Sequence, residues 1–235
     1  SDREISGRLN VTGAVGMLLF VIVATFMAVD WVMSLTPHWF SSIFGLLFVA
    51  SQGLSTLALM LALLGFLAGD RGLVRGLPDG YFRDLGNLML AFVMLWAYMS
   101  FSQYLITYSG NTVEEVSWYV QRRQNGWGII SLALVPLHFA LPFLVLLVGS
   151  KLKRSPTRLA GLALFIVLMR FVDLFWLVAP TFRPSLNVIF TDFGTPLLIG
   201  GIWLWLWAAQ LKDKPVVPLH DPRLEGALQE VVAHG

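Results

Sequence analysis

The sequence contains no cysteine and few charged residues, and each of these deficits excludes certain kinds of protein or site. Of its 235 residues only 13% are charged, against about 25% in a typical soluble domain. The absence of cysteine excludes disulfides, thiolate zinc sites and iron–sulfur clusters held by this chain. Hydrophobic residues make up 57% and the mean hydropathy is +0.73, so the composition is that of an integral membrane protein.

Long hydrophobic runs account for most of the chain. A helix needs about 20 consecutive apolar residues to cross a membrane. The sequence therefore predicts an all-α, polytopic bundle, residues 1–211, with six spans at about 11–35, 42–69, 85–108, 127–149, 157–180 and 190–211. Strands of a membrane barrel would alternate in units of about 10 residues, whereas these runs are continuous.

The distribution of lysine and arginine predicts the orientation of the chain. Basic residues are concentrated in the N-terminal arm, in the loops after the second and fourth spans, and in the C-terminal tail. The opposite loops carry only Arg122, Arg123 and Arg183. The positive-inside rule then predicts that both termini are cytoplasmic.

The sequence pattern of the tail, residues 212–235, predicts a short amphipathic helix. Asp221 suits the N-cap and Pro222 the first helical position, and apolar residues recur from Leu224 onwards at helical spacing. Two interpretations remain open: a docking helix for a cytoplasmic partner or the membrane surface, and a tail packed on its own loops.

Two opposite charges, Arg170 and Asp173, stand near the middle of the fifth apolar run. A charge at the bilayer centre costs about 2.5–3.5 kcal/mol on insertion scales, so it is retained where a partner compensates it. The spacing of three residues places both side chains on one helix face. Two interpretations follow: an ion pair that locks helices together, or a station in a proton pathway.

Further polar groups favour the pathway interpretation. His138 lies in the fourth span between two prolines, which free backbone carbonyls and admit water. Polar residues run from the midplane towards the predicted outer face, as in a half-channel, although Asp30 is also explained as an interfacial side chain and Asp192 as a helix N-terminal charge. The proton-path candidates are Asp30, Gln103, His138, Arg170, Asp173 and Asp192.

Other activities find no support in the sequence. Haem b in a helix bundle usually has two axial ligands at membrane depth, and only His138 lies that deep. There is no nucleotide-binding loop, HExxH motif or hydrolase elbow. We therefore expect no catalytic residue, metal or redox cofactor in this chain.

Three stretches resemble a known family. They are "ATFMAVDWVMSLTPHWFSSIFG" (24–45), "FSQYLITYSGNTVEEVSWY" (101–119) and "PLHDPRLEGAL" (218–228). Together they resemble the second NrfD-like, polysulfide-reductase-type membrane subunit of bacterial alternative complex III, a quinol:electron acceptor oxidoreductase of respiratory or photosynthetic chains. The family fold has ten helices, two four-helix bundles and a helix pair, so six spans are expected to correspond to its C-terminal part.

The resemblance also implies partners and a location. Quinol would be oxidised in the other NrfD-like subunit, while multihaem and monohaem cytochromes c and an iron–sulfur subunit carry the electrons. This chain would act as a scaffold and possible proton half-channel in the bacterial inner membrane, surrounded by lipids. Outer-face contacts with the extrinsic subunits are expected at His38, Trp39, Glu114, Glu115 and Trp118.

Two other function classes stay open. A secondary transporter would need a midplane site, often between internal repeats, and residues 1–115 and 116–235 show no such repeat. A purely structural membrane anchor is also compatible with the sequence.

Overall fold

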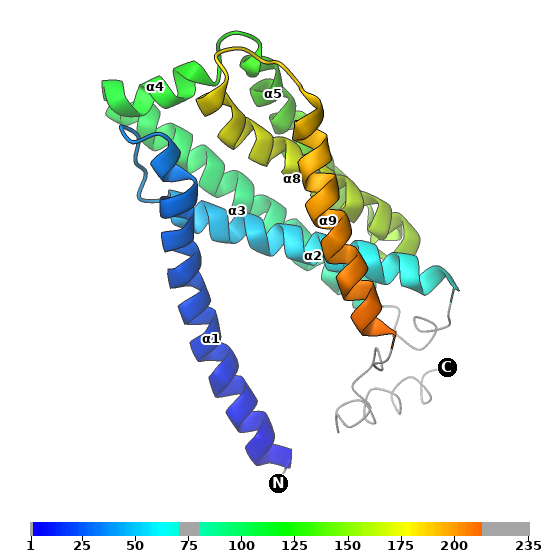
Figure 1. Cartoon of the computed structure of the whole chain (residues 1–235). Coiled ribbons are helices and arrows are strands. Elements are labelled where there is room, and N and C mark those ends of the chain that lie inside the picture. Colours follow the sequence, from blue (N-terminus) through cyan, green and yellow to red (C-terminus); the bar gives the residue numbers. More distant parts are fainter. Residues whose placement is uncertain (1, 71–79, 213–235) are drawn as a thin grey trace. The chain divides into compact units, whose positions relative to one another are not determined.

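The computed structural model describes residues 2–70 and 80–212, and every element in these ranges is helical (Figure 1). In chain order these are α1 (Asp2–Trp31), the 3₁₀ turn η1 (Met33–Leu35), α2 (Phe44–Asp70), α3 (Gly80–Gly110), α4 (Val113–Gln121), α5 (Trp127–Leu134), the π-helical turn η2 (Val135–Ala140), α6 (Leu141–Val148), α7 (Ser150–Lys153), α8 (Pro156–Phe182) and α9 (Phe190–Leu211).

Six helical stretches of the described chain are long and apolar enough to cross a membrane. They are Gly7–Leu35, Phe44–Phe66, Gly80–Gly110, Trp127–Val148, Pro156–Phe182 and Phe190–Leu211. The predicted all-α class and the six spans are confirmed, and the chain is a polytopic membrane protein. Its orientation stays a prediction, and the amphipathic tail helix expected within 212–235 lies almost wholly outside the described residues.

Local backbone chemistry sets the helix boundaries. Asn111, with φ of 47°, follows the last residue of α3. Asn125 and Gly126, with φ of 50° and 91°, separate α4 from α5. Asparagine and glycine tolerate this left-handed conformation better than other residues do. The loop predicted between the third and fourth spans therefore contains a helix of its own, α4.

The tightest packing in the bundle joins α2 to α8. Both helices bury small residues at their interface, Ala58 and Ala62 on α2, and Ala160 and Ala163 on α8. A Cβ atom added to Gly65 would overlap the Cβ of Ala160, so the two backbones lie as close as glycine permits. Small residues serve this purpose in membrane bundles, where close van der Waals packing drives helix association.

The first and last helices bury little surface. In α1, residues 7–20 are all exposed, and burial begins at Ala24 and Ala28. The residues from Asn187 onwards form a separate unit that contains α9. Along α9 no residue is fully buried, and Trp203 and Trp205 are exposed. Apolar faces of this kind suit contact with lipid or with other membrane helices.

Candidate functional site

The charged pair in α8 is buried, and its two side chains form a salt bridge with each other. Arg170 and Asp173 are each 8% exposed, and the guanidinium Nη1 donates to the carboxylate Oδ2. The pairing predicted from their spacing is therefore present. Each charge compensates the other in surroundings where an unpaired ion would be costly.

A pocket of about 90 Å³ opens beside this pair. It is enclosed by α2, α3, α4 and α8, and its lining residues are Phe44, Leu47, Phe48, Ser51, Trp96, Ser100, Gln103, Trp118, Tyr119, Arg170, Asp173, Trp176 and Leu177. One water requires about 10–15 Å³ of such space. The pocket is therefore large enough for several waters, and hydroxyl, amide and ionic groups lie around it to bind them.

Gln103 connects the pocket with the loop that follows η1. Its side chain is 4% exposed and lines the pocket. Ser41 Oγ donates to Gln103 Oε1 at 3.4 Å, and Gln103 Nε2 donates to the Tyr119 hydroxyl at 3.4 Å. Burial raises the pKa of Tyr119 to about 12, so this phenol stays protonated at neutral pH. These groups form a polar route from the charged pair towards the loop.

His138 lies behind the pocket and has unmet hydrogen-bonding capacity. It belongs to the π-helical turn η2, a type of irregularity that is frequent at functional sites. Its ring is fully buried, with its centroid 4.3 Å from that of Trp96, and neither ring nitrogen has a hydrogen-bond partner among the described residues. Asp173 and Arg170 lie within electrostatic range of the imidazole. The structure thus brings Gln103, His138, Arg170 and Asp173 into one neighbourhood.

The two other path candidates are not among the residues that line the pocket. Asp30 is exposed near the C-terminal end of α1, and it does not line the pocket. Asp192 is in the first turn of α9, where its carboxylate accepts the backbone N–H of Ile189 at 2.9 Å. This geometry matches the interpretation of Asp192 as a helix N-terminal charge. It belongs to the separate unit described above.

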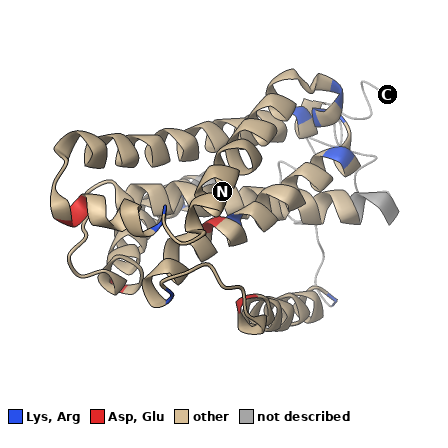
Figure 2. Cartoon of the chain, turned by 90° about the horizontal axis from the view of Figure 1, so that it is seen from above, with Lys and Arg blue, Asp and Glu red and all other residues tan. Residues whose placement is uncertain are grey.

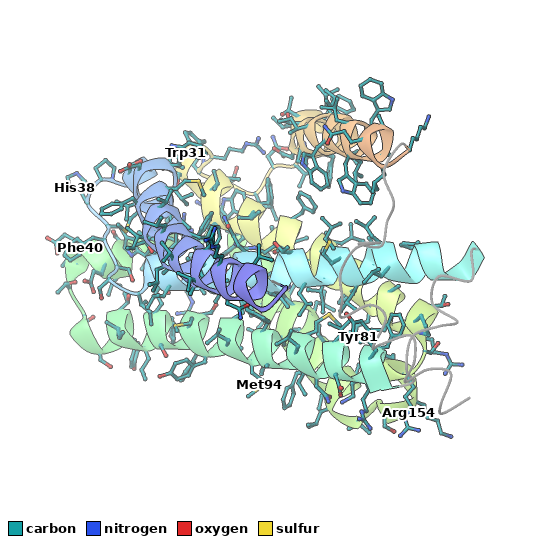
Figure 3. All side chains as sticks on the ribbon, turned by 90° about the horizontal axis from the view of Figure 1, so that it is seen from below. Trp31, His38, Phe40, Tyr81, Met94 and Arg154 are labelled. Atoms are coloured by element: carbon teal, nitrogen blue, oxygen red, sulfur yellow. The ribbon has the colours of Figure 1, made fainter. Side chains whose placement is uncertain are left out.

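The predicted outer-face contacts divide into exposed and buried residues. His38 and Glu114 are exposed and Glu115 is half-buried. Figure 3 shows His38, Phe40 and Trp31 towards one end of the helices, away from Tyr81 and Arg154. Trp39 and Trp118, by contrast, are buried, and their rings stack with centroids 4.5 Å apart. These two tryptophans form part of an aromatic cluster inside the chain.

Arg122 is a buried residue that the sequence did not reveal, since it was counted as a loop charge. It is 1% exposed, and its guanidinium carbon lies 3.6 Å from the ring centroid of Trp118. The guanidinium donates to the carbonyls of Trp118 (3.2 Å) and Leu177 (2.5 Å). Burial lowers the pKa of Arg122 to about 9, which still leaves it charged at neutral pH. The spacing of Trp118 and Arg122, four residues apart, is the signal that predicts such a contact once α4 is recognised as a helix.

Arg122 also joins α4 to the rest of the pocket. Its backbone carbonyl accepts a hydrogen bond from Ser131 Oγ at 2.9 Å, and Ser131 Oγ in turn accepts one from Trp176 Nε1 at 2.6 Å. Trp118, Tyr119 and Trp176 all line the pocket. Arg122 therefore fixes the α4 side chains that cover the pocket.

Comparisons with known proteins add no assignment to this geometry. No protein-family model matches the chain, and a search of the curated proteins finds no match.

Proposed function

We propose that this chain is a proton-conducting and scaffolding membrane subunit of a quinol-oxidising electron-transfer complex. The class of subunit is the NrfD-like one that its sequence resembles, in a bacterial alternative complex III. Electron transfer and quinol oxidation belong to partner subunits, and this chain contributes a polar half-channel.

One observation carries the proposal. A buried Arg170–Asp173 pair opens onto a pocket large enough for water, with an unpartnered imidazole behind it. A structural role, charge compensation within α8, needs the ion pair alone. The pocket volume, the Gln103–Tyr119 link and the free nitrogens of His138 are additional features that a chain of water molecules would use.

Removing the carboxylate charge tests conduction. In the Asp173→Asn variant we expect proton translocation per electron to fall several-fold while quinol oxidation continues, because the amide cannot take up and release protons. The measurement is acidification during quinol oxidation by the purified complex in liposomes. The matched control is Asp84→Asn, which alters an exposed carboxylate paired with Arg83 at 3.4 Å.

The double variant Arg170→Gln with Asp173→Asn distinguishes proton conduction from a purely structural role of the ion pair. It removes both charges, so no unpaired ion is left in the membrane. We expect it to assemble and still translocate poorly. If it translocates at the original stoichiometry, the pair only compensates charge within α8 and the chain is a structural anchor.

Purification from native membranes tests the proposed assembly. We expect c-type haem, carried by partners, to copurify with this chain, whereas a free-standing transporter would emerge without it. Because Glu114 is exposed near the predicted extrinsic subunits, Glu114→Lys should lower the haem retained per chain. Lys151→Glu, which reverses an exposed charge on α7, is the control. A haem-free preparation from gently solubilised membranes would contradict the assignment.

A further inference from the structure

Basic side chains gather where α3 begins and where α6, α7 and α8 meet. They are Arg83, Lys151, Lys153, Arg154 and Arg158. The helices α3, α6 and α8 each contact α7, so these residues share one end of the bundle. Figure 2 shows several Lys and Arg segments grouped at one end, and Figure 3 shows Tyr81 and Arg154 at the end away from His38. Within the described residues 80–87 and 148–160, Asp84 is the one acidic side chain.

Lys153 is a member of this group whose side chain is held in place by burial and by a hydrogen bond. It is only 9% exposed, and its Nζ donates to Asn87 Oδ1 at 2.7 Å. Its stem covers Gly86, where an added Cβ would lie 2.9 Å from Lys153 Cγ. Lysine at a membrane boundary ordinarily extends its ammonium towards water. Here the ammonium is held against α3.

The hydrogen-bond partner of Lys153 does not compensate the positive charge of the lysine ammonium. Asn87 offers a neutral amide oxygen, and the described chain provides no carboxylate within ion-pair distance of Nζ. A largely buried cation with a neutral partner is favoured when an anion lies beside it. An ammonium has three donors, and an N–H not used by Asn87 is available for that anion.

The group lies at the depth of lipid headgroups. The candidate spans begin at Gly80 and Pro156 and end at Val148, and the ends of membrane spans lie at the interface. Apolar side chains are exposed next to the basic group, on α3 at Leu88 and on α6 at Leu147. A positive charge at phosphate level with an exposed apolar surface beside it matches the two parts of a phospholipid.

We propose that Lys153, Asn87 and the neighbouring arginines bind the phosphate of an anionic phospholipid, whose acyl chains lie along α3 and α6. The ammonium of Lys153 and the exposed guanidinium groups of Arg154 and Arg158 supply the donors. The site is independent of the polar pocket and of the proposed function.

Native mass spectrometry of the purified full-length protein tests the proposal. The probes are phosphatidylglycerol and, as the zwitterionic reference, phosphatidylcholine. We expect the wild-type protein to bind phosphatidylglycerol preferentially, and Lys153→Gln to weaken that binding by about fivefold, which is the usual effect of one basic residue at an anionic surface. Binding of phosphatidylcholine should not change. The control Arg123→Gln, an exposed cation at the other end of the bundle, should bind phosphatidylglycerol as the wild type does.

Because Lys153 also packs on Gly86, its substitution changes packing as well as charge. A second variant therefore tests the charge alone. The double variant Arg154→Gln with Arg158→Gln changes exposed side chains alone, and it should weaken phosphatidylglycerol binding at least as much. Unchanged binding in both variants, or an equal loss in Arg123→Gln, would overturn the proposal. So would displacement of the bound lipid by inorganic phosphate alone, which would identify a site for a free anion.

Discussion

Replacing Asp173 by leucine is expected to lower the free energy of unfolding by about 3–5 kcal/mol, the usual cost of breaking a buried ion pair from one side. The substitution leaves the Arg170 guanidinium in the bundle without its carboxylate. Titration of the detergent-solubilised protein with dodecyl sulfate, followed by far-ultraviolet circular dichroism, measures the change.

The double variant Arg170→Met with Asp173→Leu should recover most of this loss. Replacing a buried pair by apolar residues of similar volume is often neutral or stabilising. The matched control is Asp84→Leu, which breaks an Arg–Asp pair whose side chains are 48% and 69% exposed. Exposed pairs contribute little, so this control should unfold like the wild type. If Asp173→Leu is equally mild, the carboxylate does not compensate a buried charge.

The second large effect is expected at Arg122. The Arg122→Ala variant loses a desolvated cation–π contact worth about 2 kcal/mol and the guanidinium hydrogen bonds to the carbonyls of Trp118 and Leu177. A hydrogen bond from a charged group contributes about 1.5–3 kcal/mol. We expect a total loss of about 3 kcal/mol or more, together with a changed tryptophan emission as Trp118 loses its neighbour.

The adjacent residue provides the control for Arg122. Arg123 has the same side chain, lies next in sequence and is exposed. Arg123→Ala should therefore leave both stability and emission unchanged. Equal effects of the two substitutions would mean that the loss follows from the net charge of the loop rather than from the buried contact.

Much of the fold was predictable because a membrane imposes simple rules. The length of hydrocarbon to be crossed determines the length of each apolar run. The six runs therefore identified the spans, although the third begins at Gly80 rather than near residue 85. Local spacing was equally informative for the Arg170–Asp173 pair, since residues three apart lie on the same face of a helix.

The rest of the site depends on contacts between segments distant in sequence. Arg122 reaches Leu177, and Gln103 reaches Ser41, and no local pattern specifies either approach. Asp30 and Gln103 were both predicted from depth alone. Depth does not determine which way a side chain faces, and Asp30 is exposed whereas Gln103 lines the pocket. Facing direction follows from helix rotation, which packing decides.

The small-residue contact between α2 and α8 also holds two walls of the pocket together. With Gly65 against Ala160, these two walls cannot slide or separate by small steps without losing close packing. The other walls come from α3 and α4, and η2 lies behind Trp96. Arg122 in turn holds α4 to α8 through the Leu177 carbonyl, so the charged pair faces a pocket whose α2, α4 and α8 walls are joined to one another by close contacts.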